Sequence, residues 1–265
     1  MQQLATDKMI AVKEGGIGWM TFNNPERRNA ISYEMRQAIL QILDDFEADP
    51  AIRVIVLKGA GDKAFVSGSD ISQFEKRRAT PEQQQEYAEL STRVQQRYDS
   101  LTKPLIAMIS GYCLGGGLGT ALNADLRFAA EDSEFGVPAG RLGIVYNWRG
   151  VKRLTALIGP ANAKEMLFTA RRFSAAEALR MGLVNKVVPR ADLESSVRDL
   201  AATIAGNAPL SVAGSKRMVD EAMKDPDKQD EVMCKALSKA ALASEDYVEG
   251  RRAFMEKRKP NWVGR

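Results

Sequence analysis

The chain has 265 residues, with 38 Lys and Arg, 34 Asp and Glu, a formal net charge of +4 and no histidine. Without an imidazole, Ser-His-Asp and Cys-His nucleophiles are excluded, and so are most catalytic zinc sites. Basic and acidic residues interleave along most of the chain, which disfavours nucleic-acid binding, and no apolar run is long enough to cross a bilayer. We expect one large globular domain with a smaller appendage, in the cytoplasm, with no metal and no nucleic-acid or membrane partner.

Two strands, a helix and a further strand are predicted before residue 60. Residues 9–12 and 17–22 are apolar and flank Gly15-Gly16, a pattern typical of a β-hairpin. Ser32 is placed to cap a helix whose apolar positions recur at three- and four-residue steps. These positions are Met35, Ala38, Ile39, Ile42, Leu43 and Phe46. Residues 54–57 are an unbroken apolar run, which predicts a strand covered on both faces.

One construction occurs twice: a strand, then small residues, then the start of a helix. The first copy is strand 64–66 followed by Ser67-Gly68-Ser69-Asp70-Ile71, and the second is strand 105–109 followed by Gly115-Gly116-Gly117 and helical residues 118–122. Such turns leave backbone N–H groups without helical partners. Because each turn can donate one N–H to the same oxygen atom, the two copies predict an oxyanion hole. Thr120-Ala121 after Gly119 excludes a phosphate-binding P-loop.

The second half of the chain becomes increasingly helical. Ser174 and Glu177 form a capping box for a helix that ends before Gly182, and a strand is predicted at residues 183–188. Three helices are then predicted at 209–223, 228–244 and 245–258. This pattern divides the chain into an α/β core, residues 1–205, and a helical C-terminal region, residues 206–265.

Five segments in chain order together resemble the crotonase superfamily, also called the enoyl-CoA hydratase/isomerase family. They are Asn24-Pro25-Glu26-Arg27-Arg28-Asn29-Ala30, Ala64-Phe65-Val66-Ser67-Gly68-Ser69-Asp70-Ile71, Gly111-Tyr112-Cys113-Leu114-Gly115-Gly116-Gly117, Ala176-Glu177-Ala178-Leu179-Arg180-Met181-Gly182-Leu183-Val184-Asn185 and Glu256-Lys257-Arg258-Lys259-Pro260-Asn261-Trp262. The resemblance implies an α/β spiral of ββα units with a helical C-terminal region. It also implies a lyase that acts on an acyl-CoA thioester, works as a homotrimer or dimer of trimers, and needs no cofactor beyond the CoA of its substrate.

Site residues follow from this resemblance by position. The backbone N–H groups of Ser69 and Gly116 are implied to bind the thioester oxygen as it becomes negative. The phosphates of CoA are implied to meet Lys257, Arg258 or Lys259 from the tail, joined by Arg27 or Arg28. The implied substrate-binding residues are Arg28, Ala30, Ser67, Gly68, Asp70, Ile71, Leu114, Gly115, Ala139, Leu142, Trp148 and Lys257. Asp70 also has a structural interpretation, as a first-turn acid that complements a helix dipole.

The chain departs from the family pattern at two positions. Hydratases of the family add water with two glutamates, and the matching positions here hold Gly119 and Ala139. Neither residue can accept or donate a proton. We therefore predict an oxyanion-stabilised enolate but poor hydration.

Tyr146 and Asn147 lie where other members of the family place a working group. Val145-Tyr146-Asn147 and the tail are similar to methylmalonyl-CoA decarboxylase, although that enzyme has histidine at the position of Ser69. Loss of CO₂ forms an enolate without a base, so a decarboxylase of short malonyl-type thioesters is one alternative, with Tyr146 orienting the carboxylate or delivering a proton. In another interpretation, Tyr146 and Trp148 only wall the acyl pocket. A non-catalytic acyl-CoA binding protein is the alternative from a different functional class.

Overall fold

Six strands form the larger of two sheets in the computed structural model, which describes residues 4–70 and 79–265. In sheet order they are β1 (Met9–Glu14), β2 (Ile17–Phe22), β3 (Val54–Gly59), β5 (Leu105–Ile109), β7 (Leu126–Ala130) and β10 (Lys186–Val188). β1 and β2 are the predicted hairpin, and every other neighbouring pair is parallel. Parallel strands need covered faces, which agrees with the unbroken apolar sequence of β3.

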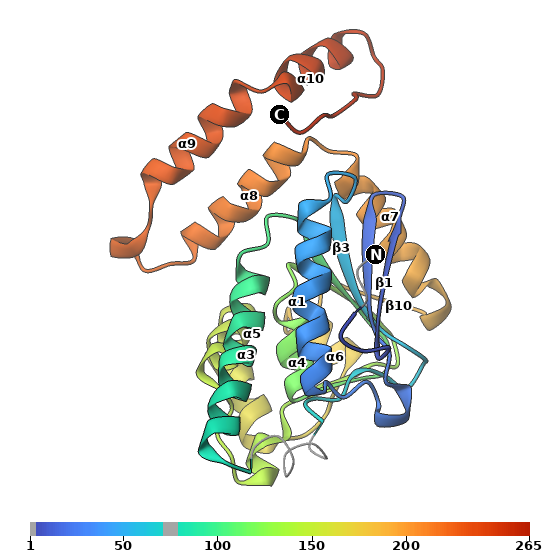
Figure 1. Cartoon of the computed structure of the whole chain (residues 1–265), viewed down its shortest axis with the longest axis vertical. Helices are drawn as coiled ribbons and strands as arrows, with labels where there is room; N and C mark the ends of the chain where they lie inside the picture. Colours follow the sequence, from blue (N-terminus) through green and yellow to red (C-terminus); the bar gives the residue numbers. More distant parts are fainter. Residues whose placement is uncertain (1–3, 71–78) are drawn as a thin grey trace.

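Helices cover both faces of this sheet. α1 (Tyr33–Ala48) is capped by the Ser32 hydroxyl, buries the six residues predicted from its periodicity, and packs beside α3 (Pro81–Asp99) (Figure 1). α7 (Leu193–Ala205) covers the opposite face, where Leu193, Val197 and Ala201 join a second apolar cluster. The core is therefore two apolar layers separated by the sheet.

A smaller sheet continues the strands of the larger one. Its order is β4 (Ala64–Val66), β6 (Tyr112–Leu114), β8 (Glu134–Gly136) and β9 (Phe173–Ser174), and the first three strands are parallel. β3, β5 and β7 thus each lead into a short strand of the second sheet. This arrangement corrects one expectation, because the glycine run follows β6 and not strand 105–109 directly. The sequence of β6 is only three residues long, too short to show a strand period.

Helical segments of different lengths connect the strands of the two sheets. They are η1 (Pro25–Arg27), α4 (Gly116–Ala121), η3 (Pro138–Leu142), α5 (Trp148–Thr169) and α6 (Ala175–Arg180), with η4 (Arg190–Asp192) before α7. The predicted capping box of Ser174 and Glu177 opens α6. The strand predicted at 183–188 is confirmed only from Lys186, as β10.

The C-terminal helices reach away from the sheets. α8 (Pro209–Ala222), α9 (Glu231–Leu242) and α10 (Glu245–Met255), with η5 (Pro226–Lys228) between the first two, confirm the three predicted helices. α9 and α10 stand apart from the core (Figure 1), whereas Lys216 of α8 bonds to the Lys103 carbonyl and the Asp125 carboxylate. The tail then returns, since the Trp262 indole donates to the Gly206 carbonyl at 2.7 Å. The predicted boundary at residue 205 lies at the end of α7, and the division itself stays a prediction.

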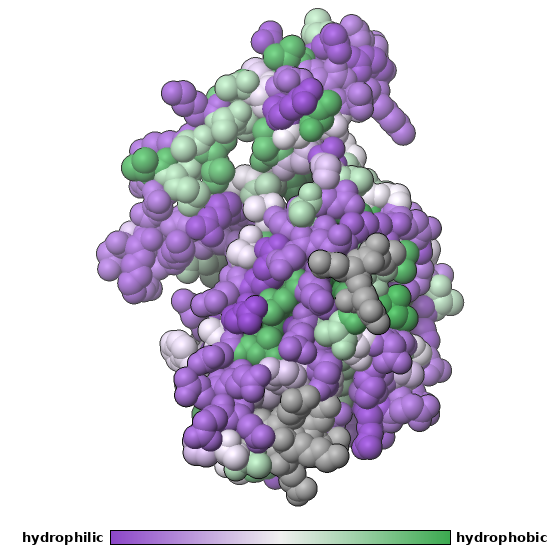
Figure 2. Space-filling view, in the orientation of Figure 1, coloured by the Kyte–Doolittle hydropathy of each residue, from purple (hydrophilic) through white to green (hydrophobic). Residues whose placement is uncertain are grey.

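Apolar side chains remain exposed on the C-terminal helices. Figure 2 shows apolar surface over this part of the molecule. Val219, Met223, Val232 and Leu242 are exposed. Along residues 4–70 and 79–265, none of the helices combines the length and apolarity needed to span a bilayer.

Candidate active site

Three turns meet at one edge of the smaller sheet. They follow the carboxyl ends of β4, β6 and β8, which are neighbouring parallel strands. Loops at the carboxyl ends of parallel strands are the usual place for ligand sites in α/β proteins. The predicted site residues 67–70, 114–117 and 139 all belong to these turns or border them.

The turn after β4 is fixed by its backbone. The Ile31 amide donates to the Gly68 carbonyl at 2.8 Å, and the Asp70 amide donates to the Ile31 carbonyl at 3.0 Å. The Ser67 amide donates to the Arg28 carbonyl at 3.1 Å. Between these anchored residues, the amide of Ser69 has no backbone acceptor within the described parts of the chain. Its N–H is therefore available to a ligand.

The turn after β6 needs glycine for steric reasons. Gly115 has φ +54°, and its amide donates to the Gly136 carbonyl at 2.8 Å. A β-carbon on Gly117 would lie 1.7 Å from the Val66 carbonyl oxygen, and one on Gly116 would lie 3.3 Å from the Ser69 nitrogen. The backbone after β6 thus packs directly on the backbone after β4. Only residues without a side chain permit this contact.

The structure therefore brings the Ser69 and Gly116 amides together. Gly116 is the first residue of α4, and the first N–H groups of a helix have no intrahelical acceptor. Both N–H groups belong to neighbouring backbones, and both residues are at least partly accessible to solvent. The pair can donate two hydrogen bonds to one oxygen atom.

Tyr146 closes one side of these turns. Its hydroxyl donates to the Gly115 carbonyl at 3.1 Å and lies 3.0 Å from the position that a β-carbon on Gly119 would occupy. Burial raises the pKa of Tyr146 well above its usual value, with a smaller contribution from Cys113. The side chain is consequently a neutral hydrogen-bond donor and a poor base.

Asn147 and Trp148 have different surroundings from Tyr146. The Asn147 side chain accepts a hydrogen bond from the Gly150 amide at 2.8 Å and is the N-cap of α5. Trp148 begins that helix with 78% of its surface exposed, and Leu142 is 69% exposed. In this chain alone, neither of these two apolar residues is buried against the paired amides.

The remaining predicted binding residues line or border the turns. Ala30 and Ala139 are buried, with Ala30 bonded through its carbonyl to the Asn24 side chain. Leu114 and Gly115 are half-buried at the end of β6. Ile71 lies outside the described residues.

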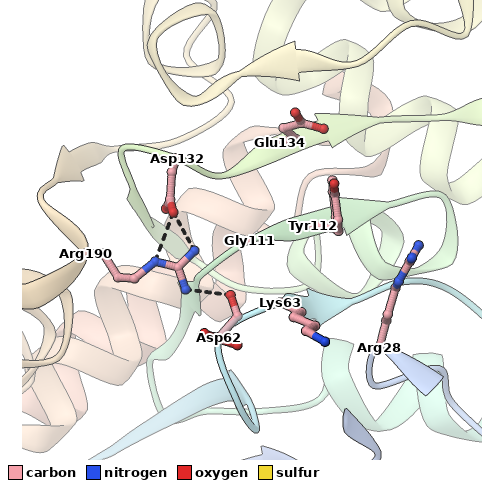
Figure 3. Close-up of a pocket in the computed structure, with 8 residues that line it drawn as sticks. All are labelled: Arg28, Asp62, Lys63, Gly111, Tyr112, Asp132, Glu134 and Arg190. Atoms are coloured by element: carbon pink, nitrogen blue, oxygen red, sulfur yellow. Dashed lines mark hydrogen bonds and ion pairs between the residues drawn. The ribbon is translucent and has the colours of Figure 1, made fainter. Parts of the chain in front are cut away.

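Arg28 occupies the opposite end of the smaller sheet. It lines a pocket of about 440 Å³ (Figure 3). The pocket residues are Arg28, Asp62, Lys63, Gly111, Tyr112, Asp132, Glu134 and Arg190. Lys63 and Gly111 precede β4 and β6, whereas the paired amides follow these strands. The pocket and the paired amides are thus separate places, linked by Arg28, whose carbonyl anchors Ser67.

The charges of this pocket are largely paired. Arg190 binds the Asp132 carboxylate and the Asp62 carbonyl, as Figure 3 shows. Glu134 pairs with Arg172 at 2.9 Å. The Arg28 guanidinium lies 5.7 Å from the centre of the Tyr112 ring and has no carboxylate partner within the described residues.

The basic tail is only partly free. Arg258 forms ion pairs with Glu249 and Glu256, so its guanidinium is already engaged. Lys257 is exposed and follows α10, and within the described chain it has no ion-pair partner. Of the two residues, Lys257 has its charge available for a phosphate.

Sequence reasoning missed Arg36. This α1 residue donates from Nη2 to the Ser69 hydroxyl at 3.0 Å and from Nε to the Tyr87 hydroxyl at 3.0 Å. Arg36 and Ser69 are 33 residues apart, so no local spacing could indicate the contact. For the described ranges, no cluster of three or more His, Cys, Asp or Glu side chains is arranged to hold a metal ion.

One family model and several known proteins match nearly the whole chain. The family model "Enoyl-CoA hydratase/isomerase" matches residues 12–265. A short-chain-enoyl-CoA hydratase of Clostridium acetobutylicum is 35% identical over 254 residues, covering 96% of each chain. A carnitinyl-CoA dehydratase of Salmonella paratyphi A is 35% identical over 268 residues, covering 98% of this chain and all of the relative.

Solved structures agree with these relatives. The crystal structure of an enoyl-CoA hydratase/carnithine racemase from Magnetospirillum magneticum has a TM-score of 0.92 and 34% identity, covering 98% of this chain and 97% of that one. An enoyl-CoA hydratase from Bacillus anthracis has a TM-score of 0.91 and 31% identity, with 98% and 100% coverage. The predicted spiral α/β fold with a helical C-terminal region is confirmed.

Proposed function

Because the chain belongs to the enoyl-CoA hydratase/isomerase family, we propose that it stabilises the enolate of an acyl-CoA thioester with the N–H groups of Ser69 and Gly116. The observation that carries this proposal is the contact between the two turns. A β-carbon on Gly116 would lie 3.3 Å from the Ser69 nitrogen. Preorganised donors of this kind contribute about 3–4 kcal/mol each to the stabilisation of a developing oxyanion.

The proton-transfer groups of this site are unusual. Gly119 and Ala139 stand at the positions where the resemblance places the two hydratase glutamates. Tyr146 lies beside Gly119, but its raised pKa keeps the phenol protonated. We therefore expect slow addition of water to enoyl-CoA thioesters, although the relatives are named as hydratases and dehydratases.

Decarboxylation of a short malonyl-type thioester is the second candidate. Cleavage of the bond to the carboxylate releases CO₂ and leaves its electron pair on the α-carbon as an enolate, so no base is required. A proton from solvent or from Tyr146 then completes the reaction. The observation that favours this candidate is a half-buried, protonated phenol beside the paired amides.

CoA and a neighbouring subunit complete the proposed site. Arg28 and Lys257 are the cations proposed for the CoA phosphates, since each lacks a carboxylate partner within the described chain.

Exposed apolar residues on α8 and α9 support assembly as a homotrimer or a dimer of trimers. Light scattering of the purified protein measures the assembly. A monomer at micromolar concentration would contradict it.

Exchange of α-protons tests enolate formation directly. The purified protein is incubated with butyryl-CoA in D₂O, and deuterium at the α-carbon is followed by NMR, in parallel with loss of crotonyl-CoA and release of CO₂ from malonyl-CoA. Exchange or CO₂ release with slow hydration supports the proposal. Fast crotonyl-CoA hydration that Tyr146→Phe leaves unchanged contradicts the account of the acid and base. Tight binding of all three thioesters without any reaction identifies a binding protein.

A further inference from the structure

Arg36 lies directly beside the proposed oxyanion site. Its Nη2 atom is 3.0 Å from the hydroxyl of Ser69, whose amide is one of the two proposed donors. Its Nε atom is 3.0 Å from the Tyr87 hydroxyl, and the guanidinium carbon is 5.1 Å from the centre of the Tyr87 ring. α1, α3 and the turn after β4 therefore hold this cation from three sides.

The described part of the chain supplies no counter-charge to Arg36. Within residues 4–70 and 79–265, no carboxylate lies within ion-pair distance of its guanidinium, whereas Arg97 pairs with Asp44 and Arg153 with Asp99. Arg36 is half-buried, so part of its hydration is lost. A partly buried cation with only neutral hydroxyl partners is unfavourable unless an anion joins it.

The Arg36 guanidinium also has N–H groups that these two hydrogen bonds do not use. A guanidinium carries five N–H groups, and the two bonds to Ser69 and Tyr87 use two of them. The remaining donors include both N–H groups of Nη1 and one of Nη2. A carboxylate matches such a planar fork better than any neutral group does, because it accepts two parallel bonds.

We propose that Arg36 binds a carboxylate on the acyl group, and that the preferred substrates are CoA thioesters of short dicarboxylic acids. This inference rests on the proposed function. The Ser69 amide is the proposed donor to the thioester oxygen, and the hydroxyl of the same residue bonds to Arg36. The proposal therefore places on Arg36 a carboxylate that lies one or two carbons beyond the thioester carbon. Arg36 is thus a specificity-determining residue, and Ser69 connects it to the reacting carbonyl.

Matched thioesters test this assignment. Calorimetry of the full-length protein compares malonyl-CoA with butyryl-CoA and succinyl-CoA with pentanoyl-CoA, with free CoA as a further ligand. We expect the acidic member of each pair to bind about tenfold more tightly, which corresponds to a charge-assisted bond of ordinary strength. Arg36→Met is expected to abolish this ratio, and Arg36→Lys is expected to retain part of it.

Arg93→Met is the matched control, because Arg93 is an exposed residue of α3. It should leave the ratio at its wild-type value. Equal binding of both members of a pair by the wild type, or a ratio that survives in Arg36→Met, overturns the inference. Arg36→Met could also weaken the binding of free CoA as much as the binding of malonyl-CoA. That result would assign the anion bound by Arg36 to the CoA phosphates and would also overturn the inference. Failure to bind any thioester contradicts the proposed function itself. Thermal unfolding of each variant shows whether it is folded.

Discussion

The hydroxyl of Tyr146 lies next to the space that a side chain on Gly119 would enter, because a β-carbon on Gly119 would lie 3.0 Å from that hydroxyl. The tyrosine ring meets a second glycine, since a β-carbon on Gly150 would lie 2.5 Å from its edge. The Tyr146 side chain thus fits between α4 and the start of α5 because Gly119 and Gly150 have no β-carbons. Tyr146 occupies the space beside the position where hydratases of the family are expected to hold an acid.

Gly119→Ala tests this shared volume. We expect a loss of about 1–2 kcal/mol in the free energy of unfolding, because the tyrosine must move and weaken its bond to Gly115. In a Tyr146→Phe background the loss should be smaller, since the closest atom is absent. Urea denaturation of the two single variants and the double variant measures the coupling. Additive losses would show that the residues do not compete for space.

Gly117→Ala should be far more damaging than an ordinary glycine substitution. The new β-carbon would lie 1.7 Å from the Val66 carbonyl oxygen, so α4 must move away from β4. We expect about 3 kcal/mol or more of destabilisation. Gly214→Ala in α8 is the control, because nothing lies within 4 Å of its β-carbon position and alanine favours a helix by about 1 kcal/mol. Similar unfolding midpoints for the two variants would contradict the packing described here.

Asn147 can be tested separately as a cap and as a catalytic residue. Asn147→Ala removes the acceptor of the Gly150 amide and should cost about 1 kcal/mol of stability. Asn147→Ser keeps a capping oxygen and should restore most of it. If Asn147 acts only as a cap, the rate of thioester turnover should fall with stability in Asn147→Ala and recover with it in Asn147→Ser. A serine variant that is stable but inactive would assign Asn147 a chemical role.

Acid should loosen the C-terminal tail through Glu249. Arg258, the Asn261 amide and Arg252 hold the pKa of this carboxyl well below its usual range. A depressed folded-state pKa stabilises the protein above the unfolded-state pKa of about 4.3, and this stabilisation is lost as the pH falls through that value toward the folded-state pKa.

Glu249→Gln provides the comparison. The wild type should be more stable than this variant at pH 7, and the difference should shrink below about pH 5, where the unfolded state begins to bind a proton. Thermal unfolding between pH 7 and pH 3 measures it. A difference that stays constant over this range would show that ionisation of Glu249 does not stabilise the tail.

Local patterns predicted most of the secondary structure. The cap at Ser32, the six buried positions of α1 and the capping box at Ser174 follow from contacts within a few residues, which a sequence displays directly. β6 was missed because three residues of a short buried strand carry no readable period. The five family segments predicted the fold through resemblance, and the comparisons confirm it.

The sequence by itself determined that glycines stand at residues 115–117, where the turn after β6 meets the turn after β4. It also determined that Gly119 and Ala139 stand where carboxylates were expected. Only the tertiary structure decided which groups lie together: the Gly116 backbone against Ser69, Tyr146 in the space beside Gly119, and Arg36 on the Ser69 hydroxyl. The reason is physical. Helix and turn signals arise between near neighbours in the chain, whereas these contacts join residues 27 to 47 positions apart. They are brought together when β4 and β6 pair and α1 packs on the sheet.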